Sequence, residues 1–219
     1  MSTITAISTS PGVGGIGIVR MSGEDCFNIL EKIFKPKVKS EIKAYSMKYG
    51  YIINPKTQEI IDEVLVSYFI SPKSYTTENM CEINSHGSQI VMQKILKICL
   101  ENGAKMAEPG EFTKKAFLNG RIDLSQAEAV IELINSKTEK EADASLKQLE
   151  GYLSKEINQI KKQVLDLLTQ IEVSIDYPEY DDIEEVTNNS ATEKLKLIKD
   201  NLEKLEQSYS NGKIIREGI

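Results

Sequence analysis

The sequence predicts an α+β fold: a mixed N-terminal α/β domain followed by an all-α helical segment. Before residue 120, β-branched stretches alternate with glycine and proline turns, a pattern typical of strands. After it, apolar residues recur at steps of three and four, which indicates amphipathic helices. We therefore place a first domain at residues 1–119 and the first part of a helical domain at residues 120–219.

The first domain is predicted to contain five strands and three helices. The strands are residues 3–9, 16–21, 43–53, 60–70 and 79–84. The first helix is expected to have Ser22 as its N-cap and to end before Pro36. The second runs over 87–100, with Gly103 just after its end, and the third over 111–118.

The helical segment is predicted to begin at an N-cap formed by Asp123 or Ser125. A long helix then covers residues 142–175, running through Gly151 and ending before Pro178. Its apolar stripe is too long to be buried by one neighbour. We therefore expect a further helix, another domain or a second copy to cover it.

Two features follow the long helix. An acidic run from Asp176 to Glu185 lacks the spacing and glycine of an EF-hand, so a solvated loop is favoured over a metal site. A last helix carries Leu195, Ile198, Leu202 and Leu205 at helical spacing.

Composition excludes several classes of protein. The 219 residues have a net charge of −6 with 40% hydrophobic and 27% charged residues, so a uniformly basic nucleic-acid binder is excluded. We expect no signal peptide and no membrane span, because the N-terminus lacks a basic region and no apolar run is long enough. The three cysteines are widely spaced and odd in number, which favours the reducing cytoplasm over a disulfide framework.

The stretch Gly12-Val13-Gly14-Gly15-Ile16-Gly17 matches the pattern G-x-G-x-x-G. A dinucleotide site requires a helix after these glycines, whereas residues 16–21 are strand-like. A P-loop requires Lys-Ser/Thr after the last glycine, where Ile18-Val19 stand. Two interpretations remain, a structural turn between strands or a loop that lets a flat ligand approach the backbone. A nucleotide-dependent oxidoreductase is accordingly disfavoured.

Three polar residues stand out in the strand-rich half. Arg20 ends an apolar strand, either as a rim residue or as a bidentate clamp for a carboxylate. Glu82 interrupts an apolar run, and either faces solvent or accepts the paired N–H groups of an aminopyrimidine. His86, the single histidine, has no partner visible in the sequence, so a structural hydrogen bond is favoured over acid–base chemistry. Spacing indicates no metal ligands and no catalytic triad, so the catalytic residue is unknown.

Several stretches also occur in a characteristic order along the chain. They are Thr9–Gly23, Tyr75–Ile83, His86-Gly87, Pro109–Ala129, Ile175–Glu179 and Arg216–Gly218. In this order they resemble the tRNA modification GTPases called MnmE or TrmE. The stretch Pro109–Ala129 is the most specific, and the resemblance covers essentially the whole chain.

The resemblance implies a homodimeric N-terminal domain similar to the folate-binding domains of aminomethyltransferases. By motif position, the folate contacts fall on Arg20, Glu82 and Arg121, the last standing where many members carry Lys. The implied ligand is 5-formyltetrahydrofolate or 5,10-methylenetetrahydrofolate, which would supply a one-carbon unit.

The resemblance further implies a GTPase domain inserted into the helical domain just after Ile219. GTP, Mg and K would bind in that domain, so residues 1–219 alone are not expected to hydrolyse GTP. With the FAD-dependent partner MnmG, also called GidA, the whole protein would modify C5 of the wobble uridine of tRNA, in a modification of the carboxymethylaminomethyl type. The alternative function is a non-catalytic homodimerisation scaffold that positions GTPase domains.

Overall fold

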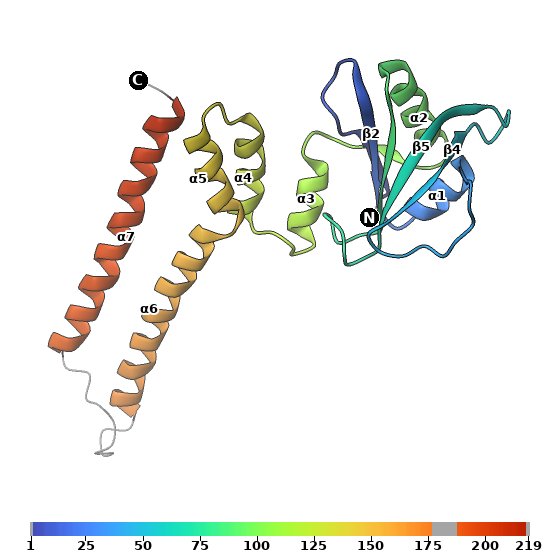
Figure 1. Cartoon of the computed structure of the whole chain (residues 1–219). Coiled ribbons are helices and arrows are strands. Elements are labelled where there is room, and N and C mark those ends of the chain that lie inside the picture. The colour runs from blue at the N-terminus through green and yellow to red at the C-terminus, as the bar shows by residue number, and fades with distance from the viewer. Residues whose placement is uncertain (1, 177–187, 218–219) are drawn as a thin grey trace. The chain divides into compact units, whose positions relative to one another are not determined.

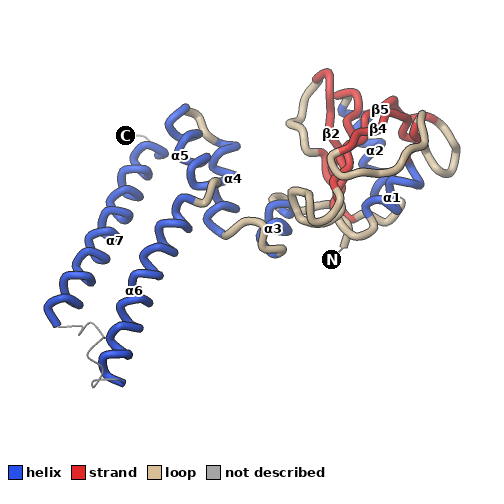
Figure 2. Tube along the Cα trace, turned by 60° about the horizontal axis from the view of Figure 1, so that its bottom comes forward, coloured by secondary structure: helices blue, strands red, loops and turns tan. Residues whose placement is uncertain are grey.

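The chain folds into two compact units, Met1–Ile122 and Asp123–Ile219, each described by itself (Figure 1). The computed structural model describes residues 2–176 and 188–217. The first unit combines a sheet with helices and the second is entirely helical in its described residues, as Figure 2 shows by colour. The predicted α+β fold class is therefore confirmed.

A seven-stranded mixed sheet forms the first unit, with the strand order β3-β4-β5-β6-β2-β1-β7. Neighbouring strands are antiparallel except β1 and β7, which are parallel. The strands β3 and β7 were not predicted, because elements of three and two residues are too short to show a period. The strands are β1 (Ile4–Ile7), β2 (Gly14–Ser22), β3 (Phe34–Pro36), β4 (Ser46–Ile53), β5 (Ile60–Phe69), β6 (Met80–Gly87) and β7 (Lys105–Met106).

Two helices, α1 (Cys26–Ile33) and α2 (Gln89–Glu101), pack on one face of this sheet (Figure 1). Alternate strand residues such as Val19, Met21 and Ile83 meet them in a fully buried core. The neighbouring residues on the same strands therefore point to the other face of the sheet. A third helix, α3 (Glu111–Leu118), has the bounds that the sequence predicted.

The predicted start of α1 was wrong. Ser22 is the last residue of β2, paired with both β1 and β6, and its buried hydroxyl shares a 2.7 Å hydrogen bond with Thr76. Gly23 then turns the chain with φ +147°, and the N-cap position falls on Asp25. The helix ends at Ile33, before the unpredicted strand β3, because Phe34 is already extended.

Four helices form the described part of the second unit: α4 (Leu124–Asn135), α5 (Glu139–Leu149), α6 (Tyr152–Asp176) and α7 (Asn188–Glu217). Asp123 is the N-cap of α4, and forms a capping box with Gln126. The prediction of a helix continuing through Gly151 was wrong. Gly151 has φ +79°, a left-handed conformation that suits a residue just after a helix end, and it separates α5 from α6.

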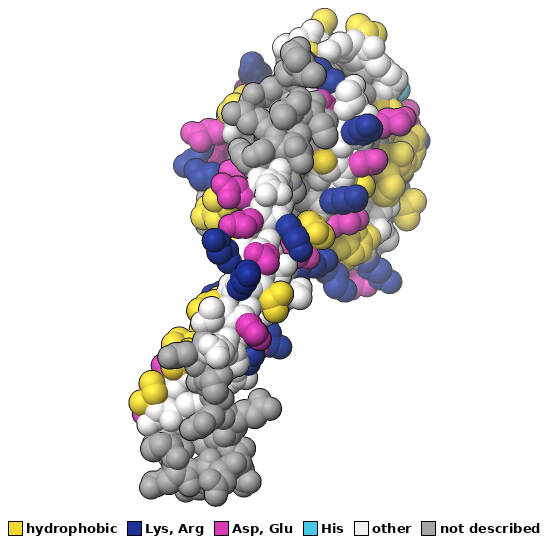
Figure 3. Space-filling model, turned by 90° about the vertical axis from the view of Figure 1, so that its left-hand side faces the viewer, with side chains coloured by type: hydrophobic (Ala, Val, Ile, Leu, Met, Phe, Trp, Pro, Cys, Tyr) yellow, Lys and Arg dark blue, Asp and Glu magenta, His cyan; other side chains and the backbone are white. Residues whose placement is uncertain are grey.

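The apolar stripes of the helical unit are only partly buried. Ile160, Leu167 and Ile198 are buried, whereas Ile157, Val164, Leu168 and Leu202 remain exposed. Apolar side chains accordingly lie among charged ones on the surface in Figure 3. None of the described helices is long and apolar enough to cross a bilayer. Pro178 and the acidic run after Asp176 lie outside the described residues.

Candidate functional site

Arg20 and Glu82 lie directly opposite each other on β2 and β6. Because Val19 and Met21 face the helices, Arg20 projects from the other face of the sheet. Its Nε donates a hydrogen bond to Glu82 Oε1 at 2.8 Å, and its Nη2 lies 2.7 Å from the same oxygen in an ion pair. The side chains are 29% and 19% exposed, so the ion pair is partly desolvated but open to a ligand. Arg20 thus clamps a carboxylate within its own chain.

The first turn of α3 connects this ion pair to Arg121, the third residue that was predicted to contact a folate. The guanidinium of Arg20 lies 5.4 Å from the ring centroid of Phe112. The next residue, Thr113, shares a 2.9 Å hydrogen bond with the Tyr75 hydroxyl. The guanidinium of Arg121 lies 4.9 Å from the Tyr75 ring centroid. Contacts through α3 therefore join Arg20, Glu82 and Arg121 into one connected array.

A buried polar network holds α3 against the segment that carries Tyr75. Lys115 Nζ donates to Glu78 Oε2 at 2.7 Å and to the Ser2 carbonyl at 2.9 Å. Glu78 also accepts a hydrogen bond from Ser22, and Asn119 Nδ2 donates to the Thr76 carbonyl at 2.7 Å. Sequence reasoning missed this network, since Lys115 has the appearance of an ordinary surface lysine on a short helix.

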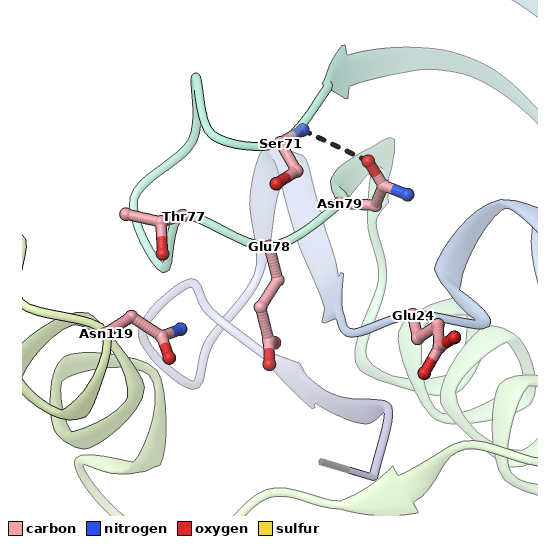
Figure 4. Close-up of a pocket in the computed structure, with 6 residues that line it drawn as sticks. All are labelled: Glu24, Ser71, Thr77, Glu78, Asn79 and Asn119. Atoms are coloured by element: carbon pink, nitrogen blue, oxygen red, sulfur yellow. Dashed lines mark hydrogen bonds between the residues drawn. The ribbon is translucent and has the colours of Figure 1, made fainter.

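A cavity of about 470 Å³ opens beside Glu78 (Figure 4). Polar residues line it, and the Ser71 backbone N–H donates a 3.1 Å hydrogen bond to Asn79 Oδ1 there. None of the three predicted folate contacts lines it. The lining residues are Glu24, Ser71, Thr77, Glu78, Asn79 and Asn119.

His86, at the end of β6, has a partner that the sequence did not reveal. Its Nδ1 lies 2.7 Å from Asp62 Oδ1, and its backbone N–H donates to Asp62 Oδ2 at 2.8 Å. The two residues are 24 positions apart, on strands whose register could not be read from the sequence. The hydrogen bond that the imidazole donates to the Asp62 carboxylate raises the pKa of His86, and the imidazole is 70% exposed.

Titration of His86 by NMR is expected to give a pKa above the ordinary value of about 6.5. Protonated His86 then contributes stability below that ordinary value, and the contribution is lost as the pH rises through the folded-state pKa. Asp62→Asn should bring the midpoint back toward the ordinary value. The single histidine makes the assignment unambiguous, and an unchanged midpoint in Asp62→Asn would contradict the pairing.

Gly12 and Val13 lie in the turn between antiparallel strands β1 and β2, and residues 14–17 already belong to β2, so a strand and not a helix follows the turn. The rejection of a Rossmann motif is therefore confirmed. Gly87 of β6 lies so close to the start of β2 that an added Cβ would collide with the Gly14 carbonyl. The tip of the turn is open, since Val13 is fully exposed and a Cβ at Gly12 or Gly15 would meet nothing.

The cysteines belong to the core and not to a site. Cys26, Cys81 and Cys99 are fully buried and unbridged, with Cys26 and Cys81 sulfur atoms 3.5 Å apart. Burial raises the pKa of Cys99 to about 12, so its thiol is protonated at neutral pH. The hydrogen bond with Cys26, together with burial, also raises the pKa of Cys81. Neither of these two thiols is suited to nucleophilic chemistry.

Comparison with known proteins finds two adjoining matches. Residues 3–121 match the family model described as the GTP-binding protein TrmE N-terminus, and residues 124–219 match the MnmE helical domain. A tRNA modification GTPase MnmE of Streptococcus pyogenes serotype M1 is 52% identical over 217 residues. One from Acetivibrio thermocellus is 51% identical over 218 residues.

These alignments cover 99% of this chain but 47% of each relative, so the chain spans about half the length of the curated relatives it matches. The two family models meet where the sheet-containing unit gives way to the helical one. The matches to both models and to these relatives agree, and they show that the chain belongs to the MnmE (TrmE) family of tRNA modification GTPases.

Proposed function

We propose that the first unit binds a tetrahydrofolate that carries a one-carbon unit, 5-formyltetrahydrofolate or 5,10-methylenetetrahydrofolate, at the array of Arg20, Glu82 and Arg121. The observation that carries the proposal is the partly exposed ion pair on the sheet face. Glu82 Oε2 accepts no hydrogen bond from the described residues, and is available to the N–H groups of an aminopyrimidine. Phe112 beside Arg20 and Tyr75 beside Arg121 add aromatic surface for a flat ligand.

Calorimetric titration with 5-formyltetrahydrofolate tests this function. We expect saturable heat with the folate and none with NADH, which a nucleotide-dependent oxidoreductase would bind. Absence of heat with the folate at high protein concentration would reject the proposal for residues 1–219. Tight binding of NADH instead would favour the oxidoreductase.

For the whole protein, we propose modification of C5 of the wobble uridine of tRNA with the FAD-dependent partner MnmG, the folate supplying the one-carbon unit. The support is the name of the relatives, tRNA modification GTPase. We assign GTP hydrolysis, with its Mg and K, to the half of those relatives that this chain does not span. The cytoplasm, where tRNA and reduced folate meet, is the proposed compartment.

The second candidate, a homodimerisation scaffold, is favoured by apolar side chains on the sheet face that carries Arg20. Met47 and Tyr49 of β4 and Leu65 of β5 are 58%, 41% and 44% exposed there. Sedimentation velocity is expected to show a dimer that Leu65→Glu dissociates, with Lys97→Glu as a control on the exposed surface of α2. A monomer throughout the micromolar range would reject this scaffold. Folate binding and dimerisation are compatible in one unit.

A further inference from the structure

The helix α3 is joined to the segment Tyr75–Glu78 by hydrogen bonds of side chains. No backbone–backbone hydrogen bond links the two within the described residues, so main-chain pairing does not set the position of the helix along the segment. Three hydrogen bonds, spread from the first turn of α3 to the residue after its last, make the connection instead. They join Thr113 to the Tyr75 hydroxyl at 2.9 Å, Lys115 to the Glu78 carboxylate at 2.7 Å and Asn119 to the Thr76 carbonyl at 2.7 Å.

Among these three contacts, the one made by Lys115 is charged and buried. The side chain of Lys115 is 5% exposed, and that of Glu78 is 18% exposed. The ammonium also donates to the Ser2 carbonyl at 2.9 Å, and Glu78 accepts a second hydrogen bond, at 3.1 Å, from the buried hydroxyl of Ser22. The pair therefore ties α3 to the chain just before β1 and to the end of β2, the strand that carries Arg20.

Such a pair contributes more to geometry than to net stability. Taking an ammonium and a carboxylate out of water costs free energy that their attraction only offsets, so a buried ion pair is weak evidence for stability. Its members must nevertheless meet at one separation and orientation, because any other arrangement leaves a buried charge without a counter-ion. Apolar side chains of similar volume tolerate small shifts of a helix, which the ion pair forbids.

The position of α3 matters because its first turn belongs to the proposed ligand site. The ring centroid of Phe112 lies 5.4 Å from the Arg20 guanidinium, and Thr113 holds the ring of Tyr75 through its hydroxyl. Lys115 follows Phe112 by three residues, so the two side chains lie on the same side of the helix. A slide or rotation of α3 that the ion pair prevents would therefore move Phe112 away from Arg20.

We propose that Lys115 and Glu78 are positioning residues of the folate site, which hold α3 where Phe112 and Tyr75 can line the ligand. This inference rests on the proposed folate binding. The cavity beside Glu78 is lined by none of the three residues of the array, so the pair acts through the helix and not by touching the ligand. Its role is the precision of the site, and loss of that precision is measurable apart from loss of stability.

The test compares stability with ligand affinity in the double variant Glu78→Leu with Lys115→Met. The variant replaces the ion pair by apolar side chains of similar size, so its urea midpoint should stay close to that of the unmodified chain. Its affinity for 5-formyltetrahydrofolate, measured by calorimetric titration, is expected to fall by about tenfold. Glu24→Ala removes the other carboxylate that lines the cavity and should change neither quantity.

NMR distinguishes a misplaced helix from other causes of weak binding. Nuclear Overhauser effects between the Phe112 ring and the Arg20 side chain should be present in the unmodified chain and weaken in the double variant. Unchanged affinity in the double variant, or weakened affinity with these effects intact, would overturn the inference while folate binding stands. A urea midpoint as low as that of Glu78→Ala would also overturn it, since the pair would then serve stability. If the unmodified chain binds no folate, the proposed function fails and this assignment fails with it.

Discussion

Glu78→Ala is expected to lower the free energy of unfolding of the first unit by about 3 kcal/mol or more. The substitution leaves the Lys115 ammonium in a site where its side chain is 5% exposed, with the Ser2 carbonyl as its remaining acceptor. A buried charge that loses its counter-ion cannot recover its hydration without opening the structure. The same change removes an acceptor from the buried hydroxyl of Ser22.

This loss of stability can be measured by urea unfolding. Amide exchange in β6 and β2 then reports on the first unit, to which Glu78 belongs. Glu24→Ala removes another carboxylate from the lining of the same cavity and should change stability by less than about 0.5 kcal/mol. The double variant Glu78→Leu with Lys115→Met should recover most of the loss, because it leaves no unpaired charge. A loss of less than about 1 kcal/mol in Glu78→Ala would show that the pair is hydrated in solution.

Glu82→Ala is expected to weaken binding of 5-formyltetrahydrofolate by about a hundredfold. The variant loses the acceptor for the pterin N–H groups and leaves the guanidinium of Arg20 uncompensated beside them. Its effect on folding should be smaller than that of Glu78→Ala, because both members of the Arg20–Glu82 pair are partly exposed.

Arg20→Ala distinguishes positioning from direct binding. It keeps the Glu82 carboxylate but removes the groups that orient it, so the loss of affinity should be smaller than in Glu82→Ala. The double variant should bind no more weakly than Glu82→Ala alone, since Arg20 acts through Glu82. Wild-type affinity in Glu82→Ala, measured by calorimetry, would contradict the assigned role of this carboxylate.

The predictions that succeeded rest on local signals. The bounds of α3, the capping residue Asp123 and the glycine after α2 all follow from chain-local chemistry. The spacing of hydrophobic residues correctly distinguished the strand-rich first part of the chain from the helical second part. Gly151 was misread because a glycine inside an apolar stripe looks the same whether its φ is negative or positive.

The pairings within the site could not be predicted. Arg20 meets Glu82, and His86 meets Asp62, only because β2, β5 and β6 are neighbours in a particular register. Register depends on contacts between distant parts of the chain, which a single sequence does not display. The buried Lys115 was hidden for the same reason, since its partner Glu78 lies 37 positions away.

Two backbone hydrogen bonds of 2.9 Å close the end of α3 in a Schellman motif, one from the Gly120 N–H to the Phe117 carbonyl and one from the Arg121 N–H to the Ala116 carbonyl. Arg121 and Ile122 are the last residues before the second unit begins at Asp123. On the other side of the boundary, Asp123 and Gln126 close the start of α4 with a capping box. Each unit therefore satisfies the backbone groups of its own helix end with local hydrogen bonds and does not need the other unit to do so.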